Sequence, residues 1–374
     1  MKKYKALIAG TGNPHIPGYI ARSVQPESRI YIAAIADYDQ GRLERSRKQC
    51  ADPDNTRFYA DYRQMFAENP DADIVIIGSD NIDHLKIFKD AMEYHYHIYM
   101  MKVISLDEAE CREMMRLEKT YDKKIGVELE LHFNSQFVKA RELYRSGAIG
   151  ELISVYLTNV SQSPCNYYPN WGSPELSYGK RVPLRPGDEV CRGGAITDHP
   201  HPYDVVRWIT GHEFKTVRAF SSRNQRSHLM VEDHAAITGK LDNGVPYFIN
   251  PSYSNLEEKC QERRLLWPKS LECNLKLTGT RGYISADFFD RHTLEVGNNV
   301  PSPDRLIVNG VPGLPIDPDD SLMGSFVATI EGRRERAETG LRESYEAVRV
   351  MNAAYDSIEQ NREITLEKTD VKVS

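Results

Sequence analysis

The chain has 374 residues, 40% of them hydrophobic, and a formal net charge of −6 at pH 7. This length favours two domains over one, and the apolar content is sufficient for two cores. The negative charge excludes nucleic acid and anionic membranes as the main partners. The six cysteines have no paired spacing, and no apolar run reaches the length of a membrane span. We therefore expect a cytoplasmic protein with reduced thiols.

Strand and helix patterns alternate over the first third of the chain. Runs rich in Ile, Val and Tyr predict buried strands at residues 4–9, 30–36, 73–78 and 97–101. Apolar residues three and four positions apart predict helices over 81–94 and 106–121. Ser105, with Glu108 three residues later, is typical of a capping box that begins the second helix. This alternation indicates an α/β domain with a doubly wound parallel sheet, which we assign to residues 1–127.

Beyond residue 127, apolar and polar residues alternate in short runs, which is typical of strands in an antiparallel sheet. The expected strands are 152–160, 216–221, 235–241, 245–250, 271–278 and 283–286. Asn243-Gly244 between two of these runs predicts a tight hairpin. Helices are expected over 134–146 and about 340–360, the second packing back on the first domain and preceding a strand at 363–366. We assign residues 128–374 to an α+β domain with a large, mostly antiparallel sheet.

Two positions in the first domain suit a dinucleotide. Gly10-Thr11-Gly12 follows the first expected strand, and Asp37 ends the second. A glycine turn lets the backbone approach a pyrophosphate at a helix N-terminus, and an acid after the next strand accepts the adenosine ribose hydroxyls, as in a Rossmann fold. Asp37 also repels a 2′-phosphate and no Ser-Arg pair follows it, so we expect NAD rather than NADP. A purely structural glycine turn is the alternative.

Further motifs follow in order along the chain. They are Ala36-Asp37 with Asp39, residues 71–77 with Ser79, Asn81 and His84, Met101-Lys102-Val103, residues 147–150, and Gly193-Gly194-Ala195 leading to Asp198, His201, Asp204 and Trp208. No single match is decisive, but the ordered series resembles the Gfo/Idh/MocA family, whose members include glucose–fructose oxidoreductase and myo-inositol dehydrogenase. The resemblance covers nearly the whole chain. It implies a substrate-binding second domain whose sheet forms a homodimer or homotetramer.

The resemblance also implies hydride transfer between NAD and a ring hydroxyl of a sugar, glycoside or cyclitol. Lys102 would be the cation beside the reacting hydroxyl, and His201 the base that takes its proton. Asp198 would orient His201 or bind an adjacent hydroxyl. The implied cofactor contacts are Gly10, Gly12, Asn13, Pro14, His15, Asp37, Ser79, Asn81, His84, Met101 and Lys102. A surface lysine and a structural histidine are the alternatives for Lys102 and His201.

The chain departs from the family pattern around Lys102. Met101 and Val103 stand where the family has Glu and Pro. A cis peptide before Val103 would cost ~2.5–4 kcal/mol, so we expect a trans bond and a different approach of Lys102. His15 replaces the third fingerprint glycine, so we expect the following helix to start late, with Pro17 in its first turn.

The second domain carries less specific candidates. Irregular stretches at 163–192 and 299–320 are either substrate walls or surface excursions. Tyr168 and Trp171 in the first stretch either stack on a sugar ring or only anchor the loop.

The start of the helix over 134–146 carries further candidates. His132 and Asn134 are candidates for substrate contact, and capping of the helix by Asn134 is the alternative. Asp198 precedes His201 by three residues instead of the family's four, which weakens its assignment. Histidines two residues apart on an extended segment could also share a metal, with His234 as a third ligand. No second motif has ligand spacing, so we expect no metal.

Two other functions would use the same residues. Tightly bound NAD could oxidise a substrate transiently, permit elimination or glycoside cleavage, and take the hydride back. Alternatively, the chain could be a regulator that binds NAD and a sugar without catalysis, which the loss of Glu and Pro around Lys102 suggests. Because the lysine and His201 both persist at motif positions, we expect a dehydrogenase.

Overall fold

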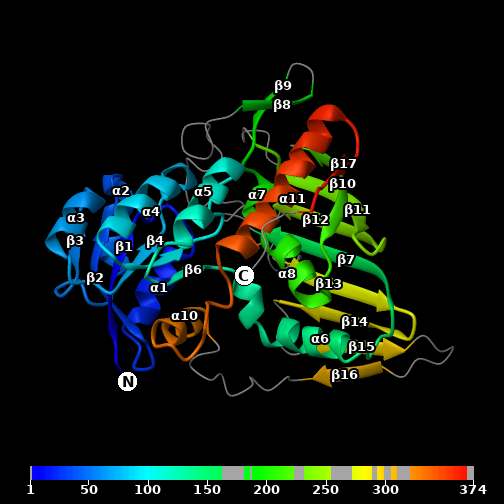
Figure 1. Cartoon of the computed structure of the whole chain (residues 1–374), viewed down its shortest axis with the longest axis horizontal. Helices are drawn as coiled ribbons and strands as arrows, with labels where there is room; N and C mark the ends of the chain where they lie inside the picture. The colour runs from blue at the N-terminus through cyan, green and yellow to red at the C-terminus, as the bar shows by residue number, and fades with distance from the viewer. Residues whose placement is uncertain are drawn as a thin grey trace, which may run out of the picture. The chain divides into compact units, whose positions relative to one another are not determined.

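Two compact units make up the chain (Figure 1). The structure is a computed structural model, and it describes residues 2–161, 181–185, 188–222, 231–253, 272–288, 293–298, 305–309 and 321–368. Unit 1 comprises Met1–Leu129 and Ile316–Tyr345, and unit 2 comprises Glu130–Pro315 and Glu346–Ser374. The expected boundary after residue 127 is close to the first of these divisions. Assigning residues 316–345 to the second domain is wrong, because the chain returns to unit 1 there.

Unit 1 is built on a parallel sheet with the strand order β3-β2-β1-β4-β5-β6 (Figure 1). Its strands are β1 (Tyr4–Ala9), β2 (Ile30–Ala36), β3 (Arg57–Tyr59), β4 (Ile74–Ile77), β5 (His97–Met100) and β6 (Ile125–Val127). Its helices are α1 (Ile16–Ser23), α2 (Gln40–Gln49), α3 (Tyr62–Glu68), the short η1 (Asn81–Asp83), α4 (His84–Glu93), α5 (Glu108–Glu118) and α10 (Leu322–Ile330). The order of the strands reverses between β1 and β4, and such sheets bind ligands beyond the carboxyl ends of their strands at that point. The predicted doubly wound sheet is confirmed.

Local sequence explains how these elements begin. The central strand β4 is a continuous apolar run, and β1 is apolar apart from the half-buried Lys5, so both strands are buried on both faces of the sheet, as is typical of parallel sheets. α1 begins at Ile16 and has Pro17 in its first turn, as predicted. The predicted cap of α5 is wrong, because Asp107 is the N-cap and accepts a hydrogen bond from Ala109 N. Ser105 Oγ instead accepts from Asp107 N and donates to Glu110.

The sequence analysis missed α10. Phe326 of this helix is 1% exposed, and its ring centroid lies 5.2 Å from that of Tyr99. A Cβ added at Gly126 would lie 2.8 Å from the Phe326 ring, so a glycine in β6 makes room for this contact. Further along the returning segment, Val127 N donates to Thr339 O at 3.1 Å. These contacts explain why the segment belongs to unit 1.

Unit 2 contains a nine-stranded sheet with the order β16-β15-β14-β13-β7-β12-β11-β10-β17. Its strands are β7 (Leu152–Ser161), β10 (Phe214–Ser222), β11 (His234–Leu241), β12 (Pro246–Tyr253), β13 (Glu272–Gly279), β14 (Gly282–Asp287), β15 (Thr293–Asn298), β16 (Arg305–Asn309) and β17 (Ile364–Thr365). Only the β7–β12 pair among these strands is parallel, so the predicted mostly antiparallel sheet is confirmed. The predicted hairpin is also confirmed, since Gly244 has φ +85° and its N–H donates to Leu241 O.

The remaining elements of unit 2 are η2 (Glu130–Phe133), α6 (Ser135–Arg145), α7 (Ala195–Asp198), α8 (His201–Thr210) and most of α11 (Leu341–Gln360), together with a hairpin of β8 (Arg181–Arg185) and β9 (Asp188–Cys191). This hairpin and β16 correct the expectation that 163–192 and 299–320 are irregular throughout. Only the first residues of α11 belong to unit 1, and the rest of the helix belongs to unit 2. No helix in the described part of the chain is long and apolar enough to cross a membrane.

The packing of α10 predicts the effect of Phe326→Ala. Removing this buried ring should lower the free energy of unfolding by about 3–5 kcal/mol, because unit 1 loses apolar contacts and gains a cavity. Denaturant unfolding followed by circular dichroism measures this change. Val24→Ala is the control, since Val24 is 44% exposed and its truncation should cost less than about 1 kcal/mol. Equal effects of the two variants would contradict the packing.

Candidate functional site

The turn after β1 crosses directly over the loop after β4. Gly10 has φ +86°, and a Cβ added there would lie 2.3 Å from Ser79 Cα. Gly10 N donates to Ala36 O at 2.8 Å, and Asn13 N donates to Gly78 O at 2.9 Å. Only glycine fits this crossing, which brings the predicted residues Gly10 and Ser79 together at the carboxyl ends of β1 and β4.

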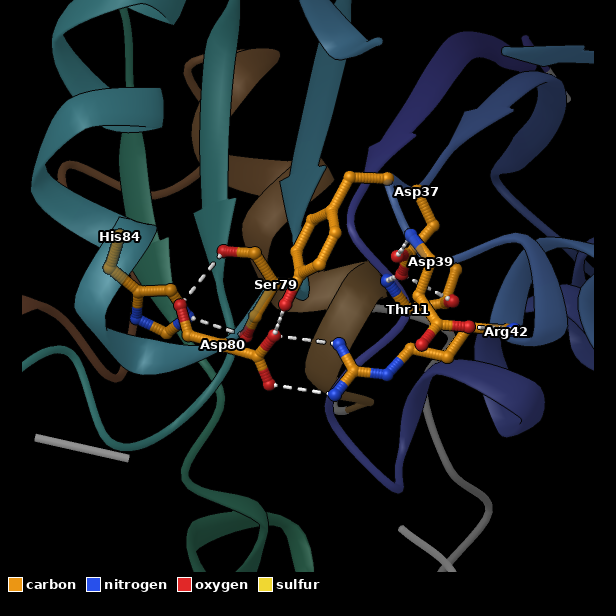
Figure 2. A network of polar contacts seen from close by, with 8 residues as sticks. Thr11, Asp37, Asp39, Arg42, Ser79, Asp80 and His84 are labelled. Atoms are coloured by element: carbon orange, nitrogen blue, oxygen red, sulfur yellow. Dashed lines mark hydrogen bonds and ion pairs between the residues drawn. The ribbon is translucent and has the colours of Figure 1, made fainter. Parts of the chain in front are cut away.

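Asp37 lies against the same turn (Figure 2). Its Oδ2 accepts hydrogen bonds from Thr11 N at 2.7 Å and Thr11 Oγ1 at 2.8 Å, and its Oδ1 accepts from Asp39 N at 2.9 Å. Burial raises the pKa of Asp37, and these hydrogen bonds oppose that effect by favouring the carboxylate. The predicted ribose acceptor therefore also fixes the glycine turn.

A second carboxylate faces Gly12 from the loop after β4. Asp80 accepts hydrogen bonds from Arg42 Nη1 at 2.6 Å, from Arg42 Nη2 at 3.0 Å and from Tyr38 Oη at 2.7 Å (Figure 2). A Cβ added at Gly12 would lie 2.9 Å from Asp80 Oδ1 and 3.0 Å from Arg42 Nη1. Gly12 therefore makes room for this ion pair, which sequence reasoning did not identify.

Three consecutive carbonyl groups after β5 accept hydrogen bonds from side chains. Asn13 Nδ2 donates to Lys102 O at 2.9 Å, Asn81 Nδ2 donates to Val103 O, and His84 Nδ1 faces Ile104 O at 3.1 Å. His84 Nε2 lies 3.2 Å from Ser79 O. Burial lowers the pKa of His84, so its neutral ring donates one hydrogen bond at a time. Three predicted cofactor residues thus position the backbone at Lys102.

The expected trans bond after Lys102 is wrong, because the Lys102–Val103 peptide is cis. The sequence argument counted only the intrinsic preference of the bond and not the side chains that hold the carbonyl groups on both sides of it. Met101 is fully buried, and Lys102 is 4% exposed at the end of β5.

Glu128 supplies a buried carboxylate that sequence reasoning missed. It follows β6, is 2% exposed, and places Oε1 2.6 Å from His15 Nδ1. Burial opposes its ionisation, but the charges of His15, Lys102 and Arg22 lower the pKa of Glu128 below its ordinary value. Glu128 could have been predicted from the sequence, because it follows a parallel strand, as Lys102 does, and ligands bind beyond the carboxyl ends of such strands.

His201 is the first residue of α8 and is 7% exposed. Its Nε2 lies 3.8 Å from Glu130 Oε1, a carboxylate that sequence reasoning also missed. Asp198 is the last residue of α7, and its N–H donates to Gly194 O at 3.0 Å. The expected extended segment at 198–201 is therefore wrong, since these residues join two helices.

Two other candidates in unit 2 serve the fold. His132 Nε2 lies 2.8 Å from Asp204 Oδ2, with both side chains 1% exposed, and its ring stacks on Trp208 at 4.2 Å. Asn134 Oδ1 accepts from two N–H groups at the start of α6, which confirms the capping alternative.

His199 Nε2 lies 3.1 Å from Ser252 O. No group of three potential metal ligands occurs in the described part of the chain. Tyr168 and Trp171 lie outside the described residues.

Glu232 holds the segment that leads to His201. It is fully buried, accepts from Ile196 N at 3.0 Å and from Tyr355 Oη at 2.9 Å, and its carbonyl accepts from Ala195 N at 3.1 Å. Burial raises the pKa of Glu232 to about 7, although both hydrogen bonds to the carboxylate favour its charged form.

Comparison with known families covers both units. The model "Oxidoreductase family, NAD-binding Rossmann fold" matches residues 4–129, and the model "GFO/IDH/MocA C-terminal domain" matches residues 137–285. The chain belongs to the Gfo/Idh/MocA family. The resemblance stated from the sequence is thereby confirmed, as is the NAD-binding Rossmann fold of the first domain.

Relatives of the chain within the family are distant. Inositol 2-dehydrogenase of Salmonella typhimurium is 20% identical over 67% of this chain and 68% of its own. An inositol dehydrogenase homolog from Azotobacter vinelandii, complexed with NAD+, has a TM-score of 0.77 at 17% identity and covers 98% of both chains. Aldose-aldose oxidoreductase from Caulobacter crescentus, complexed with glycerol, has a TM-score of 0.76 at 17% identity, over 98% of this chain and all of its own. At these identities the structures show a shared fold.

The residues of unit 1 fit the cofactor of the Gfo/Idh/MocA family. A buried carboxylate, Asp37, ends β2, and Gly10 keeps side chains out of the crossing between the two loops. Lys102 and His15 add positive charge near the ends of β5 and β1, which suits a dinucleotide that carries two negative phosphates.

Glu232→Gln should remove a pH dependence from the stability of the protein. Because burial raises the pKa of Glu232, its contribution to stability is fully present below the ordinary value of 4.5 and is lost as the pH rises towards 7. Relative to the Gln variant, the wild type should lose on the order of 3 kcal/mol over this window, seen as a falling Tm in thermal unfolding at several pH values. Glu142→Gln, at an exposed site, is the control and should follow the wild type. Parallel profiles for wild type and the Glu232 variant would contradict the assignment.

Proposed function

We propose that the protein is an NAD-dependent oxidoreductase that transfers a hydride between nicotinamide and a ring hydroxyl of a sugar, glycoside or cyclitol. The observation that carries the proposal is the position of Lys102, a buried ammonium after β5. Its own carbonyl and the next accept hydrogen bonds from asparagine side chains, and the carbonyl after them faces the His84 ring. Relatives named as inositol and aldose oxidoreductases support the substrate class. NAD is preferred over NADP, because Asp37 repels a 2′-phosphate.

The chemistry divides between two side chains. NAD+, when bound, accepts the hydride from the carbinol carbon. Lys102 stabilises the alkoxide that develops on the hydroxyl oxygen, since a fixed cation in a poorly solvated site favours the charged form. His201 takes the hydroxyl proton, and Glu130 favours the imidazolium that results. Asp198 orients His201 or binds an adjacent hydroxyl.

The remaining cofactor contacts follow from the described loops. Asp37 accepts the adenosine ribose hydroxyls, and Gly12, Pro14, His15 and Met101 line the path from ribose to nicotinamide. Asn13, Asn81 and His84 act on the cofactor through the Lys102 segment that they hold. Ser79 supports the crossing at Gly10.

Substitution of both proposed catalytic residues tests the function. Purified protein is incubated with NAD+ and a panel of sugars, glycosides and cyclitols, and NADH is followed by its absorbance. Lys102→Met and His201→Asn should each lower kcat at least about 100-fold, because each removes a group that acts in the transition state. Lys139→Met and His212→Asn replace members of an exposed and a half-buried ion pair outside the proposed site and should retain wild-type turnover.

Three results would redirect the proposal. Cofactor that survives desalting, with solvent deuterium entering the product and no NADH accumulating, would show a redox-neutral enzyme. Turnover that both site variants leave unchanged would contradict the catalytic assignment. NAD+ and sugar binding without turnover of any substrate would show a regulator.

We further propose that a second copy of the chain covers the outer face of the nine-stranded sheet. Tyr156 and Phe248 stack at 5.3 Å on neighbouring strands and are 46% and 36% exposed. Phe220, on the same face of β10, is 57% exposed. Aromatic side chains in contact on an exposed face are typical of an interface.

Tyr156→Lys with Phe248→Glu should convert a homodimer or homotetramer to smaller species, because charges replace the apolar centre of the contact. Size-exclusion chromatography with light scattering measures the mass. Val24→Lys, at an exposed apolar residue of α1's C-terminal cap, is the control and should leave the mass unchanged. A monomeric wild type would contradict the proposed assembly.

A further inference from the structure

The loop between β1 and α1, together with the first turn of α1, uses most of its own N–H groups. In dinucleotide-binding folds these groups and the helix N-terminus hold the diphosphate. Here the N–H groups of five residues donate to oxygens of unit 1, namely Thr11, Asn13, His15, Ile16 and Gly18. Pro14 and Pro17 have no N–H to offer. A diphosphate at this loop therefore needs a further source of positive charge.

His15 stands where that charge is needed. It is the N-cap of α1, occupies the place of the third fingerprint glycine, and its side chain is 30% exposed. Its Nδ1 lies 2.6 Å from Oε1 of the buried Glu128. A carboxylate at this distance favours the charged imidazolium, and the partly exposed ring keeps access to a ligand.

Glu128 is surrounded by cations. Lys102 after β5, Arg22 on α1 and His15 all act on its charge, and Tyr19 of α1 lies near it. Glu128 Oε2 is buried and has no hydrogen-bond partner within the described residues. Three cations thus act on one carboxylate, and positive charge at this position suits an anionic ligand.

We propose that the His15 imidazolium, held in place and kept charged by Glu128, binds the diphosphate of the dinucleotide in place of the N–H groups that the loop has used. His15 is thereby a binding residue with a charge that titrates, and Glu128 is a positioning residue. The inference rests on the proposed function, because it requires NAD at this loop. Affinity for the dinucleotide should fall as the pH rises through the titration of His15 and the imidazolium is lost.

The charge of His15 can be measured without any cofactor. Hydrogen–deuterium exchange at the C2 position of histidine, followed by mass spectrometry, reports the titration of each imidazole in the intact protein. Glu128→Gln should lower the midpoint of His15 by about one pH unit or more, because it removes the adjacent negative charge. The control is the half-buried pair of His212 and Asp242 at 3.0 Å, whose midpoint should not move in this variant. An unchanged midpoint for His15 would overturn the role of Glu128.

Binding then tests the ligand. Calorimetry at several pH values compares NADH, ADP-ribose and AMP with the wild type, His15→Gln and the control His212→Gln. His15→Gln should weaken NADH and ADP-ribose on the order of 10-fold near neutral pH and leave AMP within about twofold, because only the first two carry the diphosphate. The variant should also lose the fall in affinity with rising pH.

The outcomes separate the inference from the proposed function. A wild type that binds NADH, with a His15 variant that binds ADP-ribose equally well at every pH, would overturn the inference alone. A wild type that binds neither NADH nor ADP-ribose would overturn the proposed function together with the inference. His15→Gln keeps the test valid if Glu128→Gln fails to fold, since His15 is partly exposed.

Discussion

Three backbone carbonyl oxygens, those of Lys102, Val103 and Ile104, face side-chain nitrogen donors, and the arrangement of the cofactor half depends on them. These side chains come from two connections at the carboxyl edge of the parallel sheet, Asn13 from the one after β1 and Asn81 and His84 from the one after β4. Buried carbonyl groups need partners, so each donor that is lost leaves an uncompensated polar atom. Moving any one loop therefore moves the backbone that carries the lysine.

Charge is distributed around this framework by buried carboxylates. Asp37 accepts hydrogen bonds from Thr11, and Asp80 forms an ion pair with Arg42 beside Gly12. Glu128 contacts His15, and the charge of Lys102 also acts on it. Burying such a pair of charges costs desolvation free energy, so we expect these pairs where the charges also act on a ligand or on the site. In unit 2, Glu130 beside His201 follows the same principle.

The sequence predicted the architecture well where the signal was local. β1 and β2 have the predicted bounds because each is a mainly apolar run between turns, interrupted in β1 only by Lys5. α10 was missed because its sequence is apolar nearly all round and offers no polar face to reveal a helical period. The helix is buried because Phe326 packs against β5 and β6, which lie about 200 residues earlier in the chain.

The positions of the candidate residues were predicted better than their contacts within the protein. Lys102, Gly10 and Asp37 lie at the strand ends where the family motifs placed them. The hydrogen bonds by which Asn13 and Asn81 hold the backbone beside the lysine were not predicted, because side-chain direction is set by long-range contacts. The same reason hid Glu128, whose partner lies at the other end of the domain sequence.

A crystal structure of the protein with NAD+ bound is the measurement that tests this account most directly. The account predicts that, beside the bound nucleotide, the Lys102 and Val103 carbonyl oxygens still accept hydrogen bonds from Asn13 and Asn81, and the Ile104 carbonyl from His84. Either asparagine turned away from its carbonyl and onto the nucleotide would contradict it.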